Sequence, residues 1–200
     1  MSTIDGQELV DRKHEIQTKL SQSNILFGRV CMPNLFFSPP INMHYEIDKL
    51  LVDESEKFLD IIAPRDHAKS TVISNAFPTN QVLSSWVLKG QKEFVLLISK
   101  TSRVAEETML GPVKYALNYS SPLIDIYGHW GENTAKVWTK DRIVLKNDSV
   151  LMARGIGQHV TGIRHLEVRP TIIIIDDPQD KDNTKTQAAM EMHLSWLLGE

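Results

Sequence analysis

Four consecutive isoleucines, in the stretch PTIIIIDDP at residues 170–178, constrain the fold more than any other feature of the sequence. A short apolar run between turn residues is typical of a strand that is buried on both faces. The stretch EFVLLIS at 93–99 has the same character, and KFLDIIAP at 57–64 predicts a third buried strand that ends at Pro64. Because helical segments separate these runs, we expect an α/β fold with a mostly parallel sheet flanked by helices.

Helical periodicity and turn residues complete the predicted element order. Helices are expected over residues 4–22, 42–56, 69–89, 100–120 and 184–200. Proline removes a backbone donor, so Pro78 should kink or interrupt its helix, and Gly111-Pro112 should break the next one. Residues 135–155 alternate apolar and polar side chains around two turn signals, which predicts an antiparallel hairpin or meander.

The overall composition is that of an ordinary globular chain. With 200 residues, 42% hydrophobic and 24% charged, the chain is long enough for one domain with a real core. The formal net charge of -3 excludes a general attraction to nucleic acid or anionic lipid, so any such contact needs a local patch. Cys31 is the only cysteine, which excludes an intramolecular disulfide and fits a reducing compartment. The polar N-terminus and the lack of a roughly 20-residue apolar run predict an intracellular protein that is not in a membrane.

The stretch IIAPRDHAKST at residues 61–71 has the spacing of a phosphate-binding loop, G-x-x-x-x-G-K-[ST]. Lys69 and Ser70 occupy the required positions, whereas Ala63 and Ala68 replace the two glycines. Such a loop needs converging backbone N–H groups, a lysine that reaches the outer phosphates and a hydroxyl that ligates Mg²⁺. Alanine resists a positive φ, so the loop has less backbone freedom than the glycine pattern provides. The alternative is a plain turn followed by a helix start.

The loop lies between a predicted strand and a predicted helix, which is the arrangement that a phosphate-binding loop requires. The candidate nucleotide-contacting residues are Ala63, Pro64, Arg65, Asp66, His67, Ala68, Lys69, Ser70 and Thr71.

Two aspartates follow the four isoleucines. A carboxylate at the end of a later buried strand holds Mg²⁺ in P-loop enzymes, and the next acid polarises the attacking water. We therefore expect Ser70 and Asp176 to hold Mg²⁺, and Asp177 to be catalytic. The alternative is a core strand capped by a turn. The loop and the double acid together predict an ATP–Mg²⁺ site.

Several of these segments resemble the large terminase subunit of tailed bacteriophages. They are MHYEIDKLL, APRDHAKST, FVLLISKTSRVAEE and GIGQHVTGIRHLEVRPTIIIIDDPQD, and the resemblance covers roughly residues 40–198. It implies an N-terminal ASCE-type P-loop ATPase domain that hydrolyses ATP to move double-stranded DNA into a procapsid. It also implies a portal protein and a small terminase subunit as partners, a homo-oligomeric ring, and the cytoplasm of an infected bacterium as the location.

The resemblance assigns further roles to single residues. Arg65 corresponds to an arginine that contacts the γ-phosphate. Asp177 corresponds to a catalytic carboxylate that is often glutamate, and Asp180 or Asp182 are alternatives to it. Arg164 and Arg169 correspond to contacts with phosphate or DNA, or else they pair with acidic side chains at the surface.

The resemblance also sets an expected domain organisation. Residues 1–40 are expected to form a helical and connecting segment, and residues 41–200 a P-loop ATPase domain that is truncated before its last core strands. The nuclease domain of the family is expected to be absent. Two alternatives stay open: another ASCE ATPase, such as a helicase-like enzyme, or a nucleotide-binding remnant without turnover.

Overall fold

The computed structural model describes residues 6–53, 55, 57–64, 66–158, 160, 162–179 and 186–198. It is an α/β structure with a mixed five-stranded sheet in the order β2-β3-β4-β1-β5. The strands are β1 (Phe94–Ser99), β2 (Val137–Trp138), β3 (Arg142–Val144), β4 (Val150–Gly155) and β5 (Ile172–Ile175). The helices are α1 (Gly6–Ser21), α2 (Asn24–Cys31), α3 (Asn42–Val52), α4 (Phe77–Lys89), α5 (Ser102–Val104), α6 (Gly111–Tyr119), α7 (Ser121–Tyr127) and α8 (Gln187–Leu198).

The sheet combines parallel and antiparallel pairing. Strand β1 lies inside the sheet, next to its β5 edge, and pairs in parallel with β4 on one side and β5 on the other. Strands β2, β3 and β4 form an antiparallel meander, which confirms the pattern predicted at 135–155. The parallel part is therefore limited to three strands, and the prediction of a mostly parallel sheet is corrected to a mixed one.

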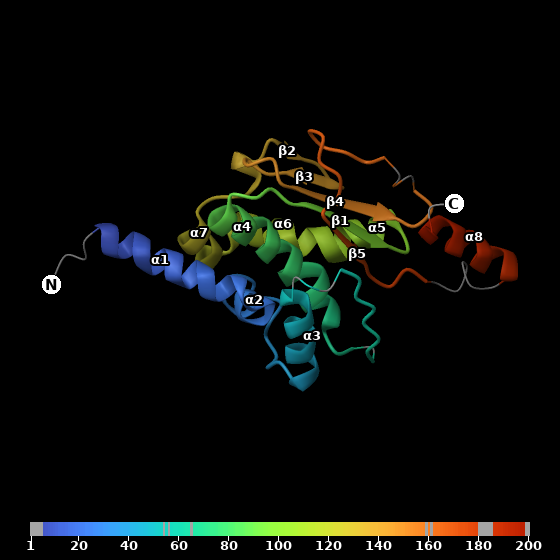
Figure 1. Cartoon of the computed structure of the whole chain (residues 1–200), viewed down its shortest axis with the longest axis horizontal. Coiled ribbons are helices and arrows are strands. Elements are labelled where there is room, and N and C mark those ends of the chain that lie inside the picture. The colour runs from blue at the N-terminus through green and yellow to red at the C-terminus, as the bar shows by residue number, and fades with distance from the viewer. Residues whose placement is uncertain are drawn as a thin grey trace.

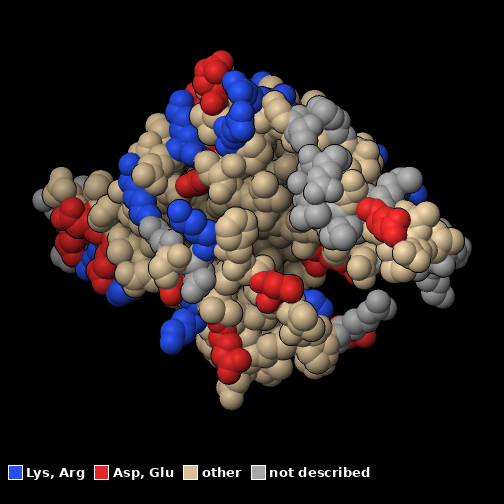
Figure 2. Space-filling view, turned by 45° about the vertical axis from the view of Figure 1, so that its right-hand side comes forward, with Lys and Arg blue, Asp and Glu red and all other residues tan. Residues whose placement is uncertain are grey.

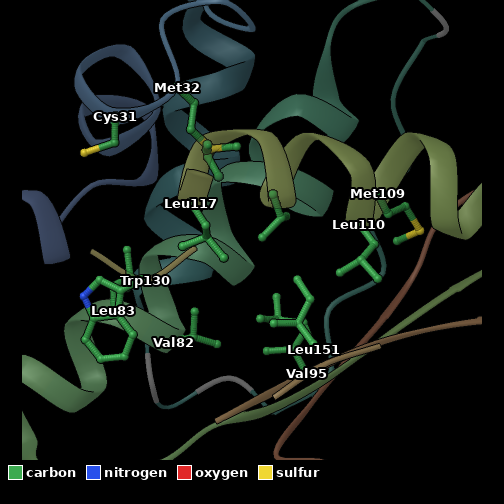
Figure 3. Close-up of a cluster of buried hydrophobic side chains, with 14 of the residues drawn as sticks. Cys31, Met32, Val82, Leu83, Val95, Met109, Leu110, Leu117, Trp130 and Leu151 are labelled. Atoms are coloured by element: carbon green, nitrogen blue, oxygen red, sulfur yellow. The ribbon is translucent and has the colours of Figure 1, made fainter. Parts of the chain in front are cut away.

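Side chains alternate across the sheet and build two clusters. In β1, Val95 and Leu97 pack under the helices together with Leu151 of β4, whereas Leu96 and Ile98 pack on the opposite face. Figure 1 shows most of the helices gathered below the sheet, with α1 extending away to the left and α8 at the right. Figure 3 shows the larger cluster, in which Val95 and Leu151 meet helix residues such as Leu117. This cluster supplies most of the apolar burial and positions the strand ends.

The N-terminal helices belong to the same core. Leu20 of α1 and Phe27 of α2 lie in the larger cluster beside residues of α4 and β1. Buried Asp48 of α3 accepts hydrogen bonds from the Ser23 hydroxyl at 2.6 Å and the Asn24 amide at 2.7 Å, and so fixes α3 to the start of α2. Residues 6–40 therefore pack against the domain expected at 41–200.

The two proline-containing helices are not interrupted. The helix after Lys69 passes through a π-helical segment, Thr71–Ala76, and continues as α4 through Pro78. The helix after Thr101 passes through a second π segment, Ala105–Leu110, and continues as α6 through Pro112. Each wider π turn directly precedes the proline, where an α turn would bring a carbonyl against its ring. The predicted break at Gly111-Pro112 is therefore wrong, and at Pro78 the helix is distorted by a π segment but not interrupted.

Asn75 joins the two π segments. Its buried amide donates to the carbonyls of Thr108 and Met109, both at 3.1 Å. The Thr108 carbonyl is the one that an α-helical amide at Pro112 would have bonded, and proline has no such donor. Asn75 thus supplies the hydrogen bond that Pro112 cannot donate, and it connects the helix that continues as α4 to the helix that continues as α6.

The prediction of a buried strand at 57–64 is also wrong. This segment has no regular secondary structure, and Phe58 and Ile62 are 93% and 92% exposed. Only Ile61 packs, against the small cluster of Ile25, Ile47 and Val72. A strand needs a partner with open hydrogen-bonding groups, and the five paired strands do not include this segment. Its apolar composition alone did not determine its conformation.

Candidate functional site

The candidate phosphate loop follows this extended segment and ends where the helix begins at Lys69. Asp66 and Ala68 have positive φ angles of 63° and 50°. These are left-handed conformations. Glycine adopts them freely, whereas other residues adopt them at a cost of about 1 kcal/mol each. Ala68 therefore adopts the backbone region that a glycine at its place in the phosphate-loop pattern would favour.

The strained loop is held from α3. The His44 Nδ1 accepts from the Ile41 amide at 3.0 Å, which places the ring proton on Nε2. The Nε2 group then donates to the His67 carbonyl at 2.6 Å. His67 lies between the two left-handed residues, and His44 is buried. A strained backbone persists when its surroundings fix it, and His44 provides that constraint.

The Lys69 side chain folds back onto the first residues of the loop. Its amino group donates to the carbonyls of Ala63 at 3.1 Å and Pro64 at 3.3 Å. The side chain is half-buried, and the two carbonyls are neutral acceptors. An anion placed inside the loop would be a stronger acceptor for this ammonium group, because charge-assisted hydrogen bonds are stronger than neutral ones.

The double acid lies at the end of β5. The Asp176 amide still donates to the Ile98 carbonyl of β1 at 2.9 Å, so its backbone is fixed by the sheet. Its carboxylate accepts from the hydroxyl of Ser74 at 2.7 Å. Ser74 is buried and lies in the π segment that follows the candidate loop. This bond connects the loop's helix directly to the end of the four-isoleucine strand.

Ser74 was missed by the sequence analysis, which assigned the hydroxyl partner to Ser70. Ser70 is exposed and lies one turn earlier on the same helix. A spacing of four residues keeps Ser74 and Ser70 on nearly the same helix face, but no sequence signal pairs Ser74 with the distant Asp176. Thr71 is half-buried and begins the π segment.

The structure describes only some of the remaining predicted residues. Asp177 is exposed and left-handed, with φ of 47°, and follows Asp176 directly. Arg65 lies outside the described residues, as do Asp180 and Asp182. Arg164 lies 3.8 Å from Glu167, so it has the surface ion pair that was the alternative to a DNA contact.

Arg169 lines a cavity on the second face of the sheet. The cavity has a volume of about 310 Å³, and Ile173, Ile175 and Trp196 also line it. Because Ile175 immediately precedes Asp176, this cavity adjoins the end of β5. The Trp196 indole donates to the Gln158 carbonyl at 3.0 Å, which ties α8 to the loop that follows β4.

The search for metal clusters and membrane spans covers all residues that the structure describes, including the candidate site. No cluster of three or more His, Cys, Asp or Glu side chains suited to a metal occurs among the residues that the structure describes. Within the same residues, no helix combines the length and apolar character needed to cross a bilayer. Comparison with protein-family models, with curated proteins and with solved structures gives no match to this chain.

Proposed function

We propose that the chain binds ATP with Mg²⁺ at the loop 63–71 and the end of β5, as a P-loop ATPase of the ASCE type. The observation that carries this proposal is the hydrogen bond between Ser74 and Asp176. It brings the helix after the candidate loop against the acid that ends the isoleucine strand. In a magnesium–nucleotide site these two elements must meet, since the loop holds the phosphates and the acid holds the metal.

The loop fits a phosphate group. Asp66, His67 and Ala68 are exposed, and two of these three residues are left-handed. Backbone N–H groups in turns that include left-handed residues form concave sites for anions. Lys69 adds a positive charge at the inner side of the loop, where it now contacts only carbonyls among its observed acceptors.

The donor set also fits Mg²⁺, which prefers oxygen ligands and retains several waters. Asp176 offers a carboxylate that the sheet and Ser74 hold in place. The Ser70 hydroxyl lies one turn away and is exposed. When bound, magnesium–ATP supplies the phosphoanhydride bond to be hydrolysed. The exposed Asp177 carboxylate is placed next to Asp176, where it can orient a water molecule and accept its proton.

The resemblance to large terminase subunits supports a more specific proposal. The chain would then be the ATPase part of a motor that packages double-stranded DNA into a phage procapsid. Its partners would be a portal protein and a small terminase subunit, in a homo-oligomeric ring in the host cytoplasm. Arg164 and Arg169 lie in the segment that carries part of this resemblance, and both are exposed for contact with DNA.

A second candidate is nucleotide binding without turnover. Two observations favour it: Ser70 is exposed while Ser74 holds Asp176, and the segment before the loop is not part of the sheet. Both leave the loop less firmly fixed relative to Asp176 than a turnover site requires. The two candidates share the binding site and differ in hydrolysis.

Calorimetric titration of the full chain with ATP and Mg²⁺ tests binding. Lys69→Ala should weaken binding by at least about tenfold, because one charge-assisted contact is lost. Lys49→Ala removes an exposed lysine from α3 and serves as the matched control, with unchanged affinity. Equal affinity in wild type and Lys69→Ala would exclude the loop as the phosphate site.

Hydrolysis separates the two candidates. Asp176→Asn should weaken Mg²⁺-dependent binding, whereas Asp177→Asn should keep binding and stop phosphate release. Phosphate release by the wild type, stimulated by double-stranded DNA, is expected for the motor ATPase. Binding without release, with or without DNA, would favour the second candidate.

A further inference from the structure

A second group of cations lies on the face of the sheet that carries the smaller cluster of Leu96, Ile98 and Met152. Arg142 begins β3, and its Nη2 group lies 2.9 Å from Nδ1 of His165. Four residues lie in one row across the sheet, one from each neighbouring strand. In order they are Arg142 of β3, Met152 of β4, Leu96 of β1 and Ile173 of β5. Three strand spacings of about 4.8 Å place Arg142 about 14 Å from β5, so this group is separate from the candidate nucleotide site.

The charges around His165 are mostly positive. Its pKa is lowered because burial disfavours the charged ring, and Arg142 lowers it further. Lys92 and Lys136 lower it as well, whereas Asp148, which is in ion-pair contact with both lysines, raises it. Three of the four charges that act on the ring are therefore positive. Figure 2 shows Lys and Arg side chains gathered along the upper left of the molecular surface, while acidic side chains are more scattered.

Two hydrogen-bond donors in this group have no partner. Since Nδ1 of the neutral His165 ring accepts from Arg142, Nε2 carries the ring proton. Both this Nε2 and the Arg142 Nε are buried and lack a hydrogen-bond partner in the described structure. Native proteins leave few buried donors unsatisfied, so each such group needs an explanation. A negatively charged oxygen acceptor would satisfy both.

His165 is presented by a strained turn. The amides and carbonyls of His165 and Val168 exchange two hydrogen bonds of 2.9 Å, which closes a two-residue turn. Its central residues, Leu166 and Glu167, have φ angles of 45° and 66°. Glycine and asparagine favour these angles, whereas leucine and glutamate adopt them with strain. Strained backbone of this kind is often found at ligand-binding sites, so the strain at Leu166 and Glu167 is consistent with a turn that contributes to a binding site.

From these observations we propose that Arg142 and His165 bind a phosphate group, with Lys92 and Lys136 at its rim. Arginine and lysine side chains are common partners of phosphate oxygens, and here the two donors without a partner belong to Arg142 and His165. The phosphate accepts from the two unsatisfied donors. Its source is either the backbone of a nucleic acid or a free phosphate ion. The site does not depend on the nucleotide site at loop 63–71.

The imidazole signals of His165 in NMR spectra of the full chain test this site directly. Added inorganic phosphate should shift them saturably and raise the pKa of His165, because an anion stabilises the charged ring. The other charges facing the ring are Arg142, Asp148, Lys136 and Lys92, which chloride at equal ionic strength would screen without a saturable shift. A short DNA duplex distinguishes the sources: tighter binding than phosphate, weakened by salt, indicates the nucleic-acid backbone. Saturation by phosphate alone indicates the free ion.

Variants provide the control for binding elsewhere, including the loop at 63–71. Arg142→Gln should weaken the His165 response about tenfold or more, whereas Arg12→Gln, which removes an exposed arginine from α1, should not change it. Lys136→Gln changes a half-exposed side chain and should weaken binding without affecting the fold. If Arg142→Gln does not fold, Lys136→Gln decides the question. No saturable shift of His165, or equal shifts in all these proteins, would overturn the proposal.

Discussion

The interior strand β1 and the edge strand β5 are built from similar residues but differ in packing. All six residues of β1 are buried, whereas Ile173 and Ile175 of β5 are 57% and 44% exposed. The segment 57–64, which precedes the candidate loop, also exposes large apolar side chains. The strained loop and both candidate acids lie at this less packed side. Ile174 of β5 is nevertheless buried, because it points into the cluster under the helices. The difference teaches that an apolar strand is buried only on the face that other side chains cover.

The largest effect that tests this comparison is a core truncation. Leu97→Ala in β1 should lower the free energy of unfolding by about 2–5 kcal/mol, because a fully buried leucine leaves a cavity. Ile173→Ala in β5 removes a similar volume from a side chain that is more than half exposed, and should cost much less. Denaturant titration measures both. Equal losses would mean that β5 is packed as tightly as β1.

Removal of the Asn75 amide tests how firmly the two helices that pack against β1 and β4 are joined. Asn75→Ala should destabilise by about 1–3 kcal/mol, because the Thr108 and Met109 carbonyls lose a donor in a buried place. Asn34→Ala changes an exposed amide bonded to Tyr115 and is the control, with a small effect expected. The same denaturant titration applies. A similar loss in both variants would contradict the role given to Asn75.

At the edge, Ser74→Ala tests how Asp176 is held. The loss should be about 1–2 kcal/mol, since a hydrogen bond to a carboxylate is removed while the backbone bond to β1 remains. Because the hydroxyl and the carboxylate interact with each other, Ser74→Ala and Asp176→Asn together should cost less than the sum of the two single changes. Strict additivity in this double-mutant cycle would show that the bond contributes nothing.

The fold was predictable where short-range patterns decide it. The strands at 93–99 and 170–178, the meander at 135–155 and the helix at 42–56 are confirmed to within a few residues. Periodicity and turn residues are local properties, and they are sufficient for these elements. Helices α2 and α7 were not predicted, because each is eight residues or fewer and too short for a clear period.

The errors arise where distant residues decide the structure. The segment 57–64 has the composition of a strand, but pairing depends on neighbours that its own sequence does not reveal. The helices continue through Pro78 and Pro112 because of preceding π turns, and Asn75 supplies a donor from another helix. At the candidate site, Lys69 and Asp176 could be selected from their motifs. Ser74 and His44 could not, because their roles are contacts between separate elements.

Ala68→Gly is a smaller and opposite change at the edge. It should raise the free energy of unfolding by up to about 1 kcal/mol, because glycine relieves the left-handed strain at φ of 50°. Ala188→Gly, at an exposed position of α8, should instead lower it by roughly 0.5–1 kcal/mol. Thermal melting compares the two variants. A lower melting temperature for both would show that Ala68 is not strained.

Asp148 gives the smallest effect, on the side of the sheet away from β5. Hydrogen bonds from Lys136 and then Lys92 hold its pKa below the ordinary value. A lowered folded pKa stabilises the protein above the unfolded pKa, near 3.9, and this contribution is lost as the pH falls through the folded value. Asp148→Asn should therefore reduce stability slightly at neutral pH and leave it unchanged at strongly acidic pH. Urea titrations at several pH values below 5 would detect this, and a constant difference would contradict it.

The single cysteine makes the helical core open to kinetic measurement. Cys31 is completely buried in the larger cluster, and burial raises the pKa of its thiol to about 12. A thiol reagent can therefore react only after α2 separates from its neighbours, and the labelling rate reports how often that happens. Labelling in the presence of ATP and Mg²⁺ would then show whether occupation of a distant loop slows the opening of the core. The natural Cys31 thus reports the rate at which the core opens, and no labelling site has to be introduced by mutation.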